Sequence, residues 1–244
     1  MKVALLGATK GIGRALARLM AARGDELCLL GRDAGELEKS AADLEARGAA
    51  RVTTAPCDLE DPDGFGPALD AAAESLGGLQ AIVVTAGMFG TQEALEQDVE
   101  RTRRMLTVNF ANTVTFCEHA RVRLLAGGGG KLCVFSSVAG DRGRKPVVLY
   151  GASKAGLSAY LEGLDHKFRA QGLQTICIKP GFVHTAMTEG LSPPPFAAQP
   201  EDVAARALVA IDRGKPVTYA TAIWGLVMFV IRRLPRFVMR RVGF

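Results

Sequence analysis

The chain has 244 residues, of which 48% are hydrophobic and 23% are charged, and its formal net charge is +5. This balance is typical of a globular protein, and the length suits one α/β domain, although two would also fit. Five arginines within residues 232–244 equal the whole net charge, so the rest of the chain is balanced and a nucleic-acid-binding surface is not supported. The five cysteines show no paired spacing, which favours free thiols in a reducing cytoplasm.

Short apolar runs alternate with helix-like segments along most of the chain. The expected strands are Val3–Leu6, Leu27–Leu30, Val52–Ala55, Ala81–Val84, Leu132–Phe135 and Gln174–Ile178. The expected helices are Ile12–Arg23, Ala34–Arg47, Pro62–Leu76, Asp98–Leu125 and Val147–Gln171. This alternation predicts an open parallel sheet with helices on both faces.

A proline-rich segment, residues 180–200, interrupts this alternation. Pro193, Pro194 and Pro195 cannot continue a helix because each lacks a backbone N–H. A long irregular loop after a sheet strand is often a lid over a site, although a plain surface connection is the alternative. Apolar residues of this segment suggest an apolar pocket beneath it, namely Met187, Leu191, Pro194 and Phe196.

A glycine-rich loop, Gly7-Ala8-Thr9-Lys10-Gly11-Ile12-Gly13, follows the first expected strand and opens the first expected helix. This is the context of a dinucleotide-binding loop, in which the helix N-terminus faces the phosphates. Gly7 permits a tight turn, and Gly11 and Gly13 let backbone approach a pyrophosphate. The spacing is G-x-x-x-G-x-G instead of the commoner G-x-G-x-x-G, and a tight turn without a ligand is the alternative.

The end of the second expected strand indicates which nicotinamide cofactor is preferred. An acidic residue there would bind the ribose 2′-OH of NAD, whereas this strand ends in Gly31-Arg32-Asp33. Arg32 can grip a 2′-phosphate bidentately, and Lys10 adds a second cation, so NADP(H) is predicted in preference to NAD(H). Asp33 could instead bind the ribose or cap the next helix. Asp58 could accept from the adenine amino group or stabilise a turn.

Three residues form a candidate catalytic group, namely Ser137, Tyr150 and Lys154. Lys154 lies one helical turn after Tyr150, so its charge, with that of an oxidised nicotinamide, favours the phenolate. Ser137 follows the fifth strand at the carboxyl edge of the sheet and can hold a substrate oxygen. Tyr150 then acts as the general acid or base between a ketone and a secondary alcohol. The alternative is an ordinary aromatic beside a solvated lysine, and no metal site is predicted.

These motifs together resemble the short-chain dehydrogenase/reductase family over residues 1 to about 190. The resemblance rests on the glycine loop, Ala86-Gly87, Asn109, Ser137, Tyr150-x-x-x-Lys154 and Pro180-Gly181. It implies a Rossmann-like doubly wound parallel sheet of about seven strands, a small-molecule carbonyl or alcohol substrate, and a homodimer or homotetramer built through the helices Asp98–Leu125 and Val147–Gln171.

The resemblance also implies roles for single residues. Asn109 would be a fourth catalytic residue that keeps a water in a proton relay to Lys154, and Lys154 would bind the nicotinamide ribose. Val183 and Thr185 would contact the carboxamide. The predicted cofactor-binding residues, taken together, are Gly7, Thr9, Lys10, Gly11, Ile12, Gly13, Arg32, Asp58, Leu59, Ala86, Gly87, Asn109, Tyr150, Lys154, Pro180, Gly181, Val183 and Thr185.

Two positions depart from the family pattern. Leu6 stands where the family usually has threonine, and Thr85 where it usually has asparagine. Both positions mainly brace the sheet and the cofactor loop, so altered cofactor affinity is expected without loss of chemistry.

The C-terminal extension, residues 220–244, follows a predicted NADP-binding catalytic domain at 1–219. Residues 220–231 are almost uncharged but too few to span a bilayer, which takes about 20. The residues that follow are rich in arginine and aromatic side chains, namely Arg232, Arg233, Arg236, Phe237, Arg240, Arg241 and Phe244, and Pro235 should kink or divide the helix. The extension either lies on an anionic membrane surface at the cytoplasmic face, packs on another subunit, or is disordered.

A basic group, Arg142, Arg144 and Lys145, follows Ser137 and forms either a solvated loop or a rim suited to an anionic substrate. The run Val138–Arg142, the Tyr150 helix and the segment Trp224–Arg241 resemble the branch of the family that reduces a decaprenylphosphoryl keto-pentose. That branch implies a lipid-linked or otherwise apolar ketone. A non-catalytic NADP-binding regulator or membrane-associated scaffold with the same fold is the alternative.

Overall fold

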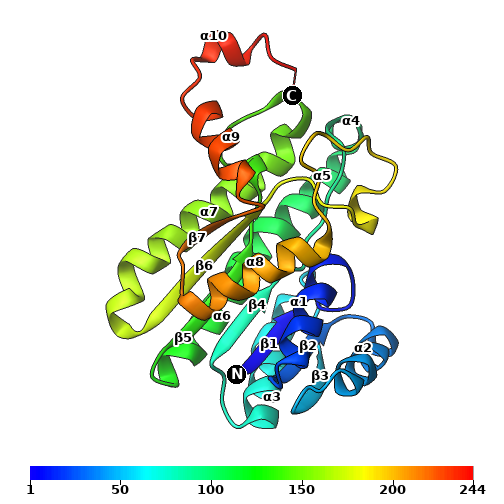
Figure 1. The fold of residues 1–244 in the computed structure, drawn as a ribbon, viewed down its shortest axis with the longest axis vertical. Coiled ribbons are helices and arrows are strands. Elements are labelled where there is room, and N and C mark those ends of the chain that lie inside the picture. Colours follow the sequence, from blue (N-terminus) through cyan, green and yellow to red (C-terminus); the bar gives the residue numbers. More distant parts are fainter. Residues whose placement is uncertain (244) are drawn as a thin grey trace.

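Seven strands form the centre of the protein, described for residues 1–243 by a computed structural model (Figure 1). The strands are β1 (Lys2–Leu6), β2 (Glu26–Gly31), β3 (Arg51–Pro56), β4 (Ala81–Val84), β5 (Gly130–Phe135), β6 (Leu173–Pro180) and β7 (Val217–Ala220). They form one sheet in the order β3-β2-β1-β4-β5-β6-β7, and every neighbouring pair is parallel. The six strands located from the sequence are confirmed, and β7 at the edge was not located.

Helices cover both faces of the sheet. They are α1 (Gly11–Ala22), α2 (Ala34–Ala46), α3 (Phe65–Leu76), α4 (Gln92–Gln97), α5 (Val99–Leu106), α6 (Thr113–Ala126), α7 (Val148–Phe168), α8 (Pro200–Arg213), α9 (Ile223–Ile231) and α10 (Arg236–Met239). Buried side chains of α1, α2 and α8 pack on one face, and those of α3, α6 and α7 pack on the other. The predicted Rossmann-like doubly wound fold is therefore confirmed.

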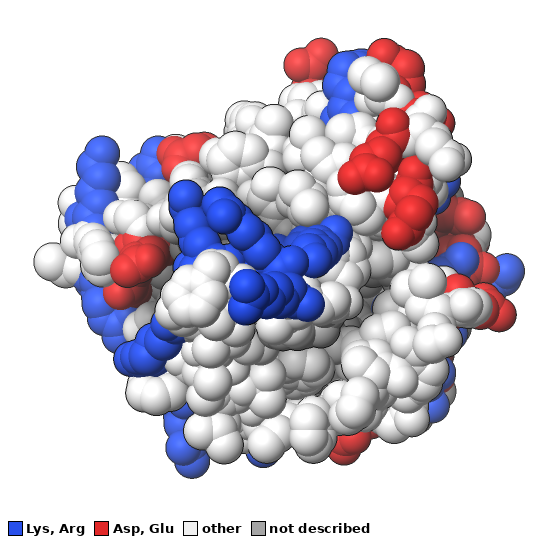
Figure 2. Space-filling model, turned by 90° about the horizontal axis from the view of Figure 1, so that it is seen from above, with Lys and Arg blue, Asp and Glu red and all other residues white. Residues whose placement is uncertain are grey.

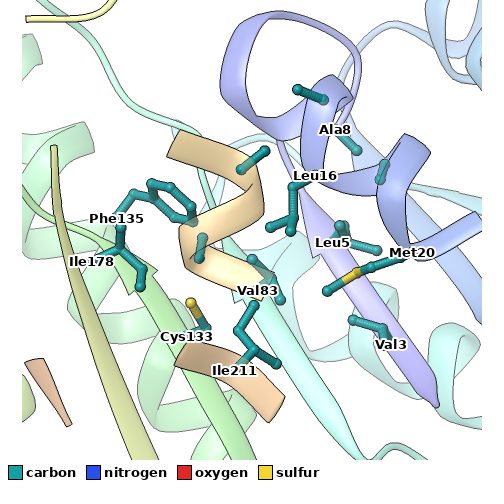
Figure 3. Close-up of a cluster of buried hydrophobic side chains, with 14 of the residues drawn as sticks. Val3, Leu5, Ala8, Leu16, Met20, Val83, Cys133, Phe135, Ile178 and Ile211 are labelled. Carbon is teal, nitrogen blue, oxygen red and sulfur yellow. The ribbon is translucent and has the colours of Figure 1, made fainter. Parts of the chain in front are cut away.

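The two hydrophobic cores use alternate residues of the same strands. In β1, Leu5 faces the core under α1 and α8, whereas Leu6 faces the core under α3 and α6. Figure 3 shows Leu5 in the first core, close to Leu16 and Met20 of α1. Burying each leucine stabilises the fold by about 2 kcal/mol. Because both faces are covered, the strand is a continuous apolar run instead of an alternating one.

The prediction of one helix over Asp98–Leu125 is wrong. The segment forms α5, then a π-helical turn at Thr107–Asn112, then α6. The Asn109 amide, within this turn, forms two hydrogen bonds with the backbone of Met88. A tertiary contact thus interrupts the local helical pattern, and π-turns of this kind are frequent at functional sites.

The proline-rich segment is irregular as predicted, with a single 3₁₀ turn at Ala186–Thr188. It ends at α8, which the sequence pattern did not predict. Pro200 stands in the first turn of that helix, where backbone N–H groups make no hydrogen bond within the helix. Proline therefore fits there although it lacks an N–H.

The C-terminal extension packs on the body of the protein through α9. Trp224, Met228 and Ile231 form a small buried cluster with Val138. Pro235 divides the helix as predicted, because α9 ends before it and α10 begins after it. Within residues 1–243 no helix combines the length and the apolarity needed to cross a bilayer. Phe244, which the sequence places in the extension, lies outside the described residues.

A buried acid joins the turn after β5 to the edge of the sheet. The Asp141 carboxylate accepts hydrogen bonds from Lys179 Nζ on β6 and from the Tyr219 hydroxyl on β7, each at 2.6 Å. The side chains of Lys179 and Asp141 are only 11% and 2% exposed. Because little water reaches either charged group, each depends on the other for stabilisation. The ion pair therefore holds the turn after β5 against β6.

We predict that Asp141→Ala lowers the free energy of unfolding by about 3 kcal/mol, because it leaves the Lys179 ammonium buried without its acid. Urea unfolding followed by circular dichroism measures the change. The matched control is Glu100→Ala, whose pair with Arg103 joins side chains that are 75% and 70% exposed. This control is expected to cost less than about 1 kcal/mol. Equal losses in the two variants would contradict the structural role of Asp141.

Candidate active site

A cavity of about 1090 Å³ lies at the carboxyl ends of the central strands. Its walls come from the loops after β1, β4, β5 and β6, together with α7 and the proline-rich segment. The strand order reverses beside β1, and open α/β sheets bind their ligands at such a point. The predicted site residues that line this cavity are Gly7, Lys10, Gly11, Ile12, Gly13, Ala86, Gly87, Ser137, Tyr150, Lys154, Pro180, Gly181, Val183 and Thr185.

The glycine loop forms a cradle that larger residues would fill. A Cβ atom on Gly13 would lie 2.2 Å from the Gly7 carbonyl oxygen, so α1 packs directly on the loop. Gly7 has a φ of +96°, and a Cβ there would lie 2.6 Å from the Ala86 nitrogen. No side chain at the Lys10 cap covers the first-turn N–H groups of α1. This uncovered helix start beside the cavity fits a dinucleotide pyrophosphate.

Hydrogen bonds brace the cradle from beneath. The Thr85 hydroxyl donates to the carbonyl oxygens of Leu6 and Gly7, at 3.2 and 2.9 Å. The Arg14 guanidinium donates to the Thr9 carbonyl at 2.7 Å. Thr85 therefore connects β4 to the end of β1 and to the glycine loop, which is the bracing role predicted for this position.

The adenosine end of the predicted site lies outside the cavity walls. Arg32 is 68% exposed after β2, and its guanidinium lies 3.6 Å from Glu60, which is held more closely by Arg104 at 2.7 Å. Asp33 accepts from the Glu36 N–H and caps α2. The Asp58 carboxylate accepts a hydrogen bond from the Glu60 N–H. Of its two predicted roles, this contact corresponds to stabilising a turn. Leu59 is buried, and its side chain belongs to the core.

The candidate catalytic residues meet on one wall of the cavity. Lys154 Nζ lies 5.8 Å from the centre of the Tyr150 ring and donates to the Phe135 carbonyl at 3.0 Å. The Ser137 hydroxyl lines the same cavity as Tyr150, and a hydrogen bond from it acts to lower the pKa of the Tyr150 phenol. The Ser137 hydroxyl also accepts from the Ala139 N–H at 3.1 Å, which fixes its position at the end of β5. The structure therefore brings the three predicted residues together.

Close backbone packing explains this convergence. A Cβ atom on Gly140 would lie 2.6 Å from the Lys154 carbonyl carbon, and one on Gly151 would lie 2.8 Å from the Ala139 carbonyl oxygen. Only glycine at both positions lets the turn after β5 touch α7. No local sequence pattern indicates this contact, although both glycines lie close to Ser137 and Tyr150 along the chain.

Asn109 lies behind the cavity and is only 1% exposed. Its amide oxygen accepts from the Met88 N–H and its amide nitrogen donates to the Met88 carbonyl, each at 2.7 Å. These bonds hold the loop after β4. A Cβ atom on Gly87 would come within 3.2 Å of Asn109 and 3.7 Å of Lys154, so the three residues are neighbours. The water relay through Asn109 stays a prediction.

The outer wall of the cavity is apolar. The four predicted residues of the proline-rich segment line it, namely Met187, Leu191, Pro194 and Phe196. Three residues of α9 that the sequence analysis missed also line it, namely Trp224, Val227 and Ile231. Their spacing of three and four residues places them on one helical face, and this spacing was the available signal.

The basic group after Ser137 divides into two roles. Arg142 donates to the Leu234 carbonyl at 2.8 Å and Lys145 donates to the Arg240 carbonyl at 2.6 Å, so both hold the C-terminal extension. Arg144 lines the cavity. Of the three residues, only Arg144 therefore faces the cavity, and the anionic substrate stays a prediction.

Comparisons with known proteins agree with this geometry. The sequence profile of the short chain dehydrogenase family matches residues 2–195. An uncharacterised oxidoreductase of Mycobacterium tuberculosis is 36% identical over 242 residues, which cover 98% of this chain and 96% of that protein. One of Streptomyces coelicolor is 33% identical over 239 residues, covering 98% and 94%. The chain belongs to the short-chain dehydrogenase/reductase family.

Solved structures show the same relationship. A short-chain type dehydrogenase/reductase from Mycobacterium ulcerans superposes with a TM-score of 0.80 at 25% identity, covering 89% of this chain and 86% of that one. A second family protein gives 0.76 at 26% identity, covering 90% and 97%. The protein is therefore an NAD(P)-dependent short-chain dehydrogenase/reductase.

Burial dominates the electrostatics of this site. Burial lowers the pKa of Lys154 to about 8, and it raises the pKa of Tyr150 to about 12 against the opposing hydrogen bond from Ser137. The predicted phenolate near neutral pH is therefore not a property of the protein alone, because desolvation of the Tyr150 phenol outweighs the hydrogen bond from Ser137 that favours the phenolate. The prediction also invoked the positive charge of oxidised nicotinamide, and this charge is the remaining group that would stabilise the Tyr150 phenolate.

The pKa of Lys154 predicts a pH-dependent stability. It falls from about 10.5 in the unfolded chain to about 8 in the folded protein, so between these values the unfolded chain binds more protons. The free energy of unfolding then rises with pH in this window. Comparing wild type with Lys154→Met by urea unfolding, we expect the difference to move by roughly 2 kcal/mol in favour of wild type from about pH 7 to about pH 9.5.

A matched control is Lys215→Met, which removes an exposed lysine. Its stability difference from wild type is expected to stay constant over the same pH range. A constant difference for Lys154→Met as well would show that the pKa of Lys154 is not lowered by burial.

Proposed function

We propose that the protein is an NADPH-dependent reductase that interconverts a ketone and a secondary alcohol, with Tyr150 as general acid and base. The observation that carries this proposal is the meeting of Ser137, Tyr150 and Lys154 on the wall of a cavity whose inner end is the glycine cradle. Acid–base residues beside a cofactor cradle suit hydride transfer to a carbonyl carbon.

The residues divide the reaction between them. NADPH, when bound, supplies the hydride. The Ser137 hydroxyl donates a hydrogen bond to the carbonyl oxygen and orients the substrate. The Tyr150 phenol transfers its proton to that oxygen as the carbonyl carbon is reduced, which yields the secondary alcohol. In oxidation the same groups act in reverse. Lys154 would hold the nicotinamide ribose and would restore the proton to Tyr150 through the proposed relay at Asn109.

Charge at the adenosine end supports a preference for NADP(H). Arg32 extends into solvent after Gly31, at the end of β2 where an acid would favour NAD. Its contact with Glu60 is long because Arg104 already binds that carboxylate. Asp33 is occupied as the cap of α2. Arg32 and the exposed Lys10 are therefore the groups that would meet a 2′-phosphate.

The cavity wall supports an apolar or lipid-linked substrate. The walls beyond the catalytic residues are formed largely by aliphatic and aromatic side chains of the proline-rich segment and α9, with Thr188, Ser192 and Glu93 as polar exceptions. Arg144 adds one cation to this wall, which suits an anionic group such as a phosphate. A ketone carried on a polyprenyl phosphate combines both properties and is the first substrate to test.

We also expect a homodimer or homotetramer. Apolar side chains remain exposed on the segments that would form it: Val99 is 76% exposed, Val122 53% and Phe110 39%. Such exposure on neighbouring helices is typical of subunit contacts.

Arg32→Ala is predicted to weaken NADPH binding by roughly 10- to 100-fold with little change for NADH, because it removes the charged grip on the 2′-phosphate. Titration of the purified protein by NADPH and NADH fluorescence measures both affinities. The matched control is Arg51→Ala, an exposed arginine at the start of β3. Equal weakening of both nucleotides by Arg32→Ala would count against the proposed NADP preference.

Tyr150→Phe is predicted to reduce ketone turnover by roughly 10²- to 10⁴-fold, since it removes the proton donor while keeping the ring. NADPH oxidation would be followed with aliphatic ketones of rising chain length and with a detergent-dispersed polyprenyl-phosphate keto-sugar. We expect kcat/KM to rise with chain length, and the variant to lose far more turnover than NADPH affinity, because Phe keeps the ring of Tyr150 and removes only its hydroxyl. Binding of NADPH by wild type without turnover of any carbonyl would instead favour the non-catalytic regulator or scaffold.

A further inference from the structure

The outward side of α9 and α10 is an apolar surface, although α9 already buries its other side. We call it the C-terminal surface. Its largest exposed side chains are Leu226 at 64%, Phe229 at 50%, Val230 at 51% and Phe237 at 61%. An isolated exposed leucine has no special meaning, but several large apolar residues on two consecutive short helices mark a surface that another body covers.

Arginines surround these apolar residues. The exposed arginines of the C-terminal surface are Arg232, Arg233, Arg236, Arg240 and Arg241. Figure 2, which looks onto this end of the molecule, shows Lys and Arg side chains gathered in one patch bordered by uncharged side chains. Within residues 1–243 no acidic side chain forms an ion pair with any of the five arginines. Their charge is therefore available to an anionic partner.

The mixture of arginines and apolar side chains on the C-terminal surface indicates which kind of partner fits it. In a two-fold dimer the same patch would face itself, so five arginines would oppose five arginines. A nucleic acid would meet the arginines but would leave Leu226 and Phe237 without apolar contact. An anionic bilayer satisfies both, because headgroups attract the arginines while the apolar side chains enter the boundary with the acyl chains.

We propose that the C-terminal surface docks the protein on an anionic lipid bilayer. The Arg233 guanidinium lies 3.5 Å from the centre of the Phe229 ring, so cationic and apolar groups already occupy one face. The surface is held firmly to the body of the protein. Trp224, Met228 and Ile231 anchor α9 from beneath, and Arg142 and Lys145 bind carbonyls of the segment.

Docking in this orientation would place the cavity directly behind the bilayer contact. The inner face of α9 lines the cavity with Trp224, Val227 and Ile231, and the outer face forms the C-terminal surface. One helix thus separates the substrate site from the lipid. Delivery of a lipid-linked ketone from the bilayer rests on the proposed function, whereas docking itself does not.

Sedimentation with vesicles tests the docking. The purified protein would be mixed with vesicles of phosphatidylcholine alone or of phosphatidylcholine with phosphatidylglycerol, at low and high salt. We expect salt-sensitive binding that requires phosphatidylglycerol. The triple variant Arg232→Gln, Arg236→Gln, Arg240→Gln is expected to bind on the order of 100-fold more weakly, since each arginine near the surface contributes roughly five-fold. The variant Leu226→Ser is expected to weaken binding several-fold without changing its dependence on phosphatidylglycerol.

Two controls make the outcome specific. Arg51→Gln, Arg206→Gln, Arg213→Gln removes three exposed arginines elsewhere and should bind as wild type does. Tyr150→Phe should also bind as wild type does, so a failure of the catalytic proposal is separable from a failure of docking. Absence of binding by wild type, or equal loss in both triple variants, overturns the proposal. So does a dimer, measured by light scattering, that Leu226→Ser dissociates, because the surface would then be covered by a second copy.

Discussion

Backbone contact between α7 and the turn after β5 is the constraint on which the catalytic arrangement depends. Gly140 lies against the Lys154 backbone with no room for a side chain. This contact places Ser137 and Tyr150 on one cavity wall although they belong to different elements. The ion pair between Asp141 and Lys179 fastens the same turn to β6. The turn is thus fixed on two sides, and the hydroxyl it carries is held in position before any substrate arrives.

Desolvation sets the resting protonation of the site. Burial favours the neutral phenol of Tyr150, with its pKa raised to about 12, and it also weakens the ammonium of Lys154, with its pKa lowered to about 8. A protonated tyrosine is the form that donates a proton to a reduced carbonyl, so the resting state suits reduction. Oxidation needs the phenolate, and a positively charged nicotinamide is the group that would favour it. In the proposed reaction, the protonation of Tyr150 would therefore be coupled to the redox state of the bound nicotinamide.

The C-terminal extension links the substrate site to the outer surface. Trp224 and Ile231 complete the cavity wall, whereas Leu226 and Phe229 of the same helix face outward. Because α9 is apolar on both sides, it cannot be interpreted as an ordinary amphipathic helix with one solvated face. One helix therefore forms part of the cavity wall and part of the outer surface, and under the proposals above changes in its sequence would alter both substrate choice and bilayer contact.

The sequence by itself determined the parallel sheet, the glycine cradle and the candidate catalytic residues. These features depend on local patterns, such as the continuous apolar run of β1 and the one-turn spacing of Tyr150 and Lys154, which hold wherever the segments pack. Only the tertiary structure decided the break of the predicted helix at Asn109, the entry of α9 into the cavity wall and the raised pKa of Tyr150. Each of these depends on contacts between segments distant in the chain, or on how much water those contacts exclude, and no local pattern contains that information.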